Sequence, residues 1–236
     1  MDKNDKYRQL YPDLPEAVYD PLKFKQYPEK EMLERAKGWF DECERRRTTR
    51  HFSRKTVPQE MIELAIKTAN TAPSGAHLQP WQFVAIDKHN LKQQIREVCE
   101  EEEFKTYTER MSDEWRRDLA PLGTDWEKAH ITDAPWIVVL FKERYQLKAD
   151  NTKKKHYYVE ESVGICAGLF ISAIHHMGLC TLTHTPNPMG FLSTLLNRPV
   201  NETAVLLFPV GYPSDSAQVP RLNRKSLDDV VQWNEG

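Results

Sequence analysis

The sequence predicts a domain in which helices are layered on a central β-sheet, in the α+β or α/β class. Segments with apolar residues at helical spacing alternate along the chain with short apolar runs such as WIVVLF, which are typical of strands buried on both faces. At 236 residues the chain is long enough for one well-buried core and short for two complete catalytic domains. The order of the strands does not follow from this pattern.

The first half of the chain divides into an arm and a patterned region. Residues 1–30 are expected to form an extended arm, because prolines recur among charged and aromatic residues, and residues 31–236 are expected to form the globular part. A helix is predicted from Glu31 to a cluster of arginines. Pro58 opens the next helix at its favoured first position, before the turn TAPSGAH. WQFVAID then predicts a strand, followed by a charged helix from Leu91 through KTYTERM.

The second half is more apolar. EESVGICAGLFISAIHHMGL is apolar almost all round, which predicts a central helix, and Gly178 is a candidate for its C-terminal cap. CTLTHT alternates as a half-buried strand does, and TAVLLFPVGYP predicts a last buried strand closed by a turn.

Composition excludes several classes of function. Lysine plus arginine (33) nearly balance aspartate plus glutamate (35), so no general attraction to nucleic acid or to an anionic membrane is expected. The four cysteines are widely spaced, which predicts reduced, buried thiols and no metal cluster. The N-terminus lacks the apolar core of a secretory signal, and the run VGICAGLFISAI is shorter than a membrane span. We therefore expect a cytoplasmic protein without a membrane partner.

Four segments carry residues that could serve chemistry. RRRTTRHFS, residues 45–53, combines guanidinium groups and hydroxyls that suit phosphate, although arginines also stabilise ordinary helix C-termini. PSGAH can present backbone N–H groups to a ligand or be a plain turn. Glu103 and Tyr107 share a helical face and, with Lys128, would suit a zwitterionic amino acid, while a solvated acidic helix is the alternative.

TLTHTP, the fourth segment, ends a predicted strand with hydroxyls and an imidazole, at the kind of position where α/β proteins bind ligands. Thr183 and Thr185 could equally be the exposed face of a half-buried strand. No nucleophile or carboxylate partner is legible in the sequence near His184 or His77, so both are interpreted as structural histidines.

In order along the chain, RRTTR, TAPSGAH with PW, EEEEFKTY, THTP, LFPVGYP and PRLNRK resemble the flavin-dependent iodotyrosine deiodinases of the nitroreductase superfamily. The resemblance covers roughly residues 40 to 230. It implies an α+β, nitroreductase-like FMN-binding sandwich with a central mixed sheet, an intertwined homodimer, a C-terminal extension and an active-site lid at about residues 100–130.

The resemblance also assigns roles to single residues. It makes Thr185 the catalytic residue, with its hydroxyl near flavin N5, and makes Ser74 and Gly75 contacts to the cofactor of the partner subunit. Ala76 would offer its backbone N–H to the substrate phenolate. Trp115 and Leu119 would cover the substrate ring. The remaining residues implied to bind FMN are Arg46, Arg47, Thr48, Arg50, Thr183, His184 and Arg224, and those implied to bind the substrate zwitterion are Glu103, Tyr107 and Lys128.

Two departures from the family pattern stand out. His184 occupies the place of a hydroxyl in the strand-end triplet, and Thr48 and Thr49 stand where a serine and an aliphatic residue are usual. Animal members carry an N-terminal membrane anchor that is not found in this sequence, so a soluble member is expected.

The implied function is reductive dehalogenation of 3-iodotyrosine and related halotyrosines to tyrosine and halide by reduced FMN. The electrons would come from an unidentified flavin reductase or from NAD(P)H. The alternative is an NAD(P)H-dependent nitroreductase or quinone reductase, which needs the same flavin site without the residues for a zwitterion. A flavoprotein that senses tyrosine derivatives without turnover ranks third.

Overall fold

The computed structural model describes residues 2–234, and the chain divides into two compact units, Met1–Phe40 and Asp41–Gly236. The first unit contains helix α1, Lys3–Leu10, and most of helix α2, Glu29–Arg45, which ends in the second unit. The expected extended arm therefore includes a helix at its start. The reason is that its first proline is Pro12, so nothing before that position interrupts a helix.

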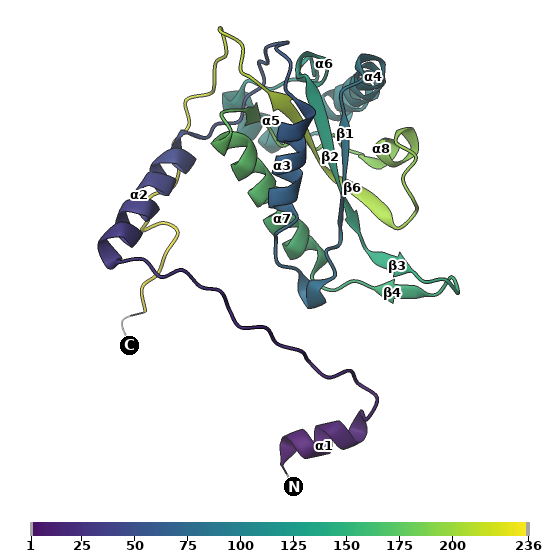
Figure 1. The fold of residues 1–236 in the computed structure, drawn as a ribbon. Helices are drawn as coiled ribbons and strands as arrows, with labels where there is room; N and C mark the ends of the chain where they lie inside the picture. Colours follow the sequence, from purple (N-terminus) through teal and green to yellow (C-terminus); the bar gives the residue numbers. More distant parts are fainter. Residues whose placement is uncertain (1, 235–236) are drawn as a thin grey trace. The chain divides into compact units, whose positions relative to one another are not determined.

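The second unit is built on a four-stranded antiparallel sheet with the strand order β1-β2-β6-β5 (Figure 1). The parallel part of the expected mixed sheet is limited, among the described residues, to one bridge between Thr48 and Thr181. The strands are β1 Trp81–Ile86, β2 Trp136–Glu143, β5 Cys180–Thr181 and β6 Glu202–Gly211.

Helices cover both faces of this sheet, and a two-stranded hairpin extends from the end of β2 (Figure 1). The hairpin strands are β3 Tyr145–Leu147 and β4 Lys153–Lys155. The helices are α3 Gln59–Ala69, α4 His89–Lys105, α5 Asp113–Leu119, α6 His130–Asp133, α7 Val159–His176 and α8 Gly190–Leu195. Three short turns are the 3-10 turns Gly75–His77 and Ala120–Leu122 and the π-helical turn Thr106–Arg110.

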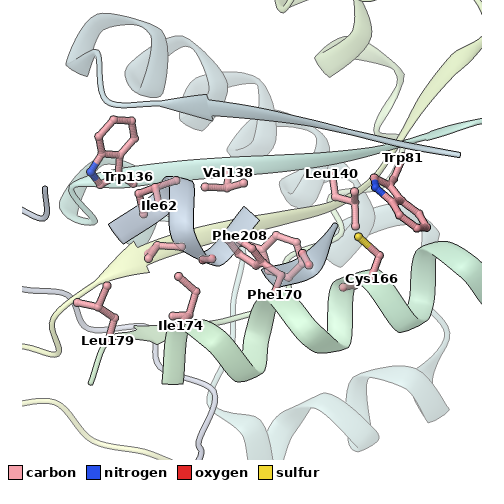
Figure 2. Packing of buried hydrophobic residues seen from close by; sticks show 14 of the residues in the cluster. Ile62, Trp81, Trp136, Val138, Leu140, Cys166, Phe170, Ile174, Leu179 and Phe208 are labelled. Carbon is pink, nitrogen blue, oxygen red and sulfur yellow. The ribbon is translucent and has the colours of Figure 1, made fainter. Parts of the chain in front are cut away.

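The core lies on both sides of β2, because successive side chains of a strand point to opposite faces. Val138 and Leu140 join the cluster under α3 and α7, whereas Ile137 and Val139 join the cluster under α4 and α8. Figure 2 shows the first cluster, in which Phe170 of α7 points toward the sheet. Its ring centroid lies 5.0 Å from that of Phe208 and 5.6 Å from that of Phe83.

The predicted central helix is confirmed as α7, and its apolar composition follows from its place against the sheet. Gly178 follows its C-terminus with φ +79°, a conformation that glycine adopts at little cost, and donates from its N–H to the carbonyl of His175 at 2.9 Å. The predicted helix at Pro58 is also confirmed, with α3 beginning one residue later. Among the described residues, none of the helices combines the length and the apolar composition needed to cross a membrane.

Candidate functional site

The strand-end segment Leu182–Thr185 is held against β6 after β5 has ended. His184 donates from its N–H to the carbonyl of Leu207 at 2.9 Å, and Leu207 returns a hydrogen bond of 2.9 Å to the carbonyl of His184. Leu182 and His184 are buried, whereas Thr183 and Thr185 are exposed. The alternation predicts this pattern, and it directs the two hydroxyl groups away from the core.

The lid segment begins where α4 gives way to the π-helical turn. Glu103 lies in the last turn of α4, and Tyr107 lies in the π-helical turn that follows directly. Both residues therefore belong to one continuous helical segment. After α5 and a 3-10 turn the chain returns to α4, where the backbone N–H of Lys128 donates to Glu100 Oε1 at 2.7 Å. That carboxylate also accepts from Arg96 Nε at 2.7 Å, so the position of Lys128 is tied to the middle of α4.

These two segments enclose a cavity of about 160 Å³, called here the lid cavity. It brings together two groups of residues that lie far apart in the sequence: the expected zwitterion trio and the expected flavin-side triplet. The lining residues are Arg50, Glu103, Thr106, Tyr107, Met111, Trp115, Leu119, Thr124, Lys128, His130, Leu182, Thr183, His184, Thr185 and Asn187.

Glu103 is the electrostatic centre of the lid cavity. Its Oε2 lies 3.4 Å from Lys128 Nζ and its Oε1 lies 3.4 Å from His184 Nε2. Burial raises the pKa of Glu103, but the hydrogen bond from His184 and the charge of Lys128 outweigh burial and leave the pKa below its usual value. The carboxylate is therefore ionised at neutral pH, next to Lys128, a residue that is only 3% exposed.

Tyr107 closes the same side of the cavity. Lys128 Nζ lies 5.5 Å from the centroid of its ring, and Lys128 also donates to the carbonyl of Asp125. Burial and the negative charge of Glu103 raise the pKa of the Tyr107 phenol above its usual value. The phenol is thus a neutral hydrogen-bonding group at physiological pH.

Two buried histidines stack against each other beside Glu103. The rings of His130 and His184 lie 5.2 Å apart between centroids at 79°, in an edge-to-face arrangement. His130 Nε2 and His184 Nδ1 are buried without a hydrogen-bond partner among the described residues. Burial and the proximity of His184 lower the pKa of His130 to about 2, and burial also lowers the pKa of His184. Both rings are neutral at physiological pH.

The arginine cluster lines a separate hollow of about 360 Å³, called here the arginine hollow. Arg224 donates to the backbone carbonyl of Arg46 at 3.1 Å, and Arg47 donates to the carbonyl of Pro220, so the C-terminal segment forms one wall. The residues lining it are Glu44, Arg46, Arg47, Thr48, Arg50, Leu122, Pro220, Leu222, Asn223 and Arg224.

The donor set of the arginine hollow fits the phosphate of FMN. Four arginines and one glutamate line it, and such an excess of positive charge is stabilised by an anion that accepts several hydrogen bonds. Arg50 lines both the arginine hollow and the lid cavity, so the two lie next to each other in the chain. Burial lowers the pKa of Arg50, as expected of a guanidinium between two cavities.

The loop at Ser74–His77 lies elsewhere. Ser74 Oγ accepts from the N–H of Gln79 at 2.9 Å, and Gly75 donates from its N–H to Ser162 Oγ at 3.3 Å, which fixes the loop to the start of α7. Ala76 has φ +50° and His77 φ +54°, left-handed conformations that are uncommon for residues with a side chain. Within the described part of the chain, Ser74, Gly75 and Ala76 line neither the lid cavity nor the arginine hollow.

The residues predicted from the sequence thus form two groups at the two cavities, and a third group, in the loop at Ser74–His77, lies away from both. Arg46, Arg47, Thr48, Arg50 and Arg224 gather at the arginine hollow, and the lid trio joins the strand-end triplet at the lid cavity. Sequence reasoning missed His130, Thr106 and Asn187, which also line the lid cavity. His130 follows Lys128 by two residues, but a single histidine in a charged segment gives no signal of its own.

This chain is similar in sequence to several known proteins. The sequence profile of the Nitroreductase family matches residues 43–212. The chain is 48% identical to "Iodotyrosine deiodinase" from Haliscomenobacter hydrossis over 91% of this chain and 96% of that protein. It is 43% identical to "Iodotyrosine deiodinase 1" from Homo sapiens, over 89% of this chain and 73% of that protein.

Among solved structures, one of oxidized iodotyrosine deiodinase bound to FMN and 3-iodo-L-tyrosine is similar to this chain. It has a TM-score of 0.73 and 31% sequence identity, over 83% of this chain and 98% of the other. A nitroreductase with bound FMN from Bacteroides fragilis has a TM-score of 0.61 at 18% identity, over 84% of this chain and 98% of the other, a likeness of fold alone.

Proposed function

We infer that this chain, which belongs to the nitroreductase family and within it to the iodotyrosine deiodinases, removes halide reductively from 3-iodotyrosine and related halotyrosines with reduced FMN. The reaction replaces a carbon–iodine bond of the ring by a carbon–hydrogen bond. It takes two electrons and one proton and releases tyrosine and iodide.

The main support for this proposal is the set of residues that line the lid cavity. The lid cavity unites a buried carboxylate, a buried ammonium group and a neutral phenol with the strand-end hydroxyls of Thr183 and Thr185. A carboxylate and an ammonium side by side match the two charges of a free amino acid. A general nitroreductase substrate has no such pair of charges and no use for this arrangement.

FMN, when bound, supplies the electrons for the reduction. We propose that Arg46, Arg47, Thr48 and Arg224 hold its phosphate end, supported by their convergence on the arginine hollow. Arg50 would connect that hollow to the lid cavity. Thr183, His184 and Thr185 would face the ring system, with the Thr185 hydroxyl as the catalytic group that donates a hydrogen bond to it.

The substrate residues follow from charge. Glu103 would accept the ammonium group of the amino acid, Lys128 would donate to its carboxylate, and Tyr107 would add a neutral hydrogen bond. The lid carrying these residues excludes water when it closes, which strengthens each electrostatic contact. Trp115 and Leu119 line the same cavity and would cover the substrate ring.

The partner we propose is a second copy of this chain. The loop at Ser74–His77 lies away from both cavities of its own chain, and Ala76 is exposed in a left-handed conformation. In an intertwined homodimer, Ser74 and Gly75 would contact the partner's FMN, and the Ala76 N–H would meet the substrate phenolate. An active site shared by two chains would need this loop to face outward, as it does.

We also propose an electron source and a compartment. A flavin reductase or NAD(P)H would reduce the FMN. Four free cysteines, two of them fully buried, support a reducing compartment such as the cytoplasm.

The deciding experiment is anaerobic iodide release. The FMN-loaded protein is reduced with dithionite and given 3-iodotyrosine, and iodide and tyrosine are quantified by chromatography. We expect one iodide and one tyrosine for each substrate consumed. Turnover of nitroaromatics with NADPH and no iodide release would instead assign the nitroreductase alternative, whereas tight binding of iodotyrosine without iodide release would assign a sensor.

A further inference from the structure

His184 contacts the carboxylate of Glu103 and is held in place by backbone hydrogen bonds to β6. Its backbone makes two hydrogen bonds of 2.9 Å with Leu207, its side chain is buried, and His130 packs edge-to-face on its ring. The residue is only 7% exposed. The imidazole therefore has little freedom to turn, and its Nε2 occupies a defined point beside Glu103.

The two oxygens of Glu103 have different partners. Oε1 faces His184 Nε2 and Oε2 faces Lys128 Nζ, each at 3.4 Å. Both contacts are long for hydrogen bonds. One donor lies on the sheet and the other on the far end of the lid, so the two differ in mobility.

The hydrogen on His184 can be assigned from its neighbours. An ionised carboxylate only accepts hydrogen bonds, so Nε2 must donate to Glu103. Burial and the positive charges of Lys128 and Arg50 lower the pKa of His184, which leaves a neutral ring with one N–H. Nδ1 is then the bare nitrogen, in agreement with its lack of a hydrogen-bond partner among the described residues.

We propose that His184 is a positioning residue that holds Glu103 in place for the ammonium group of an amino-acid substrate, and so sets the preference for halotyrosines over plain halophenols. The proposal rests on the function proposed above. When Lys128 turns to the substrate carboxylate, Oε2 of Glu103 loses its partner and becomes free for the ammonium group. Without the hydrogen bond from His184 to Oε1, Glu103 can follow Lys128 and leave the ammonium group unpaired.

The test measures how binding discriminates between two ligands. Dissociation constants of 3-iodotyrosine and of 2-iodophenol, which lacks the zwitterion, are determined by quenching of FMN fluorescence in the oxidised, FMN-loaded protein. Taking their ratio removes any general damage to the site. We expect His184→Phe, which keeps a ring but loses the donor, to reduce this preference about tenfold, as expected for one hydrogen bond to a charged group.

A variant that keeps a hydrogen-bond donor, and the position of the hydrogen on the His184 ring, test the proposal further. His184→Gln places an N–H₂ donor near the position of Nε2 and should restore the preference to within about twofold of the wild type. The ring nitrogens of His184, assigned by ¹⁵N NMR from the signals missing in His184→Phe, should show the neutral form with hydrogen on Nε2. An unchanged preference in His184→Phe, or hydrogen on Nδ1, would overturn the positioning role.

Failure of the proposal can be told apart from failure of the proposed function. Binding is measured without turnover. A wild-type protein that prefers iodotyrosine but releases no iodide overturns deiodination, and a fall of that preference in His184→Phe then still supports the role of His184. Iodide release by the wild type together with an unchanged preference in His184→Phe overturns the positioning role and leaves deiodination standing.

Discussion

The arginine hollow and the lid cavity meet at Arg50 but treat charge in opposite ways. The lining of the hollow contains four arginines and one glutamate, on partly exposed segments. In the lid cavity the carboxylate of Glu103 is paired with the ammonium of Lys128 and also lies beside the neutral imidazole of His184. An excess of one charge calls for a permanently bound anion, whereas an internal ion pair suits a ligand that enters, exchanges partners and leaves.

Mutations in the arginine hollow and in the lid cavity should therefore have different consequences. Changes at Glu103, Tyr107 or Lys128 in the lid cavity should affect binding of the amino-acid part of the substrate, and changes in the arginine hollow should affect binding of the cofactor phosphate. The following predictions run from the largest expected effect to the smallest.

Glu103→Gln should weaken binding of 3-iodotyrosine about 100-fold, because it removes the partner of the substrate ammonium and leaves Lys128 buried without its counter-charge. Binding of 2-iodophenol should suffer much less. Both constants are measured by FMN fluorescence quenching in the oxidised protein. Equal losses for the two ligands would remove the zwitterion from the interpretation of the lid cavity.

Thr185→Ala should slow iodide release about 30-fold while the dissociation constant of 3-iodotyrosine changes about twofold or less, since its hydroxyl is proposed to act on electron transfer. Single-turnover mixing of the reduced enzyme with substrate measures the rate. Thr185→Ser keeps the hydroxyl and serves as the control. If serine and alanine slow the reaction alike, the hydroxyl is not the active feature.

Arg46→Ala should weaken FMN binding about tenfold and riboflavin binding hardly at all, because riboflavin lacks the phosphate that the arginine hollow is proposed to hold. Fluorescence titration of the apoprotein measures both constants. The difference between the two flavins should shrink as salt is added. Equal weakening of both flavins would move the phosphate away from this hollow.

The stability of the fold should fall as the pH drops below 6.5, partly because of His130. The pKa of His130 is about 2 in the folded chain and 6.5 in the unfolded chain. Between these two pH values the unfolded chain binds a proton at His130 and the folded chain does not. This contribution is fully present above pH 6.5 and is lost progressively between there and pH 2. From pH 6.5 to 5.5 the loss should be about 1 kcal/mol.

His130→Phe keeps an aromatic ring against His184 and should reduce this pH dependence. Thermal unfolding at fixed protein and FMN concentrations, recorded at several pH values, compares it with the wild type. His89→Phe, at the exposed start of α4, is the matched control and should follow the wild-type curve. Parallel curves for His130→Phe and the wild type would show that His130 does not titrate as described.

The sequence predicts the buried strands and long helices well, because hydrophobic periodicity reports local burial. β1, β2, β6, α3 and α7 are confirmed within a few residues. The β3–β4 hairpin is not predictable in this way, since β4 consists of Lys153–Lys155, and lysine is depleted in strands. Only pairing with β3 makes that segment extended.

The candidate site, like the fold, has one part that the sequence predicts and one part that it does not. The trio of Glu103, Tyr107 and Lys128 follows from the family resemblance, and the structure brings its members into one cavity. The contact between His184 and Glu103 joins residues 81 positions apart, which no local pattern reports. No carboxylate partner for His184 is legible in the sequence, but the structure supplies one, because the end of α4 places Glu103 beside its ring.

Gly75 has a mechanical consequence for the start of α7. A methyl group at this position would lie 2.7 Å from the carbonyl oxygen of Tyr157 and 2.8 Å from the ring of Tyr158. Tyr158 precedes α7 in a left-handed conformation, and its carbonyl accepts the hydroxyl of Ser162 at 2.5 Å. The loop therefore packs directly on the residues that lead into the first turn of α7, and a residue larger than glycine at position 75 would force these two segments apart.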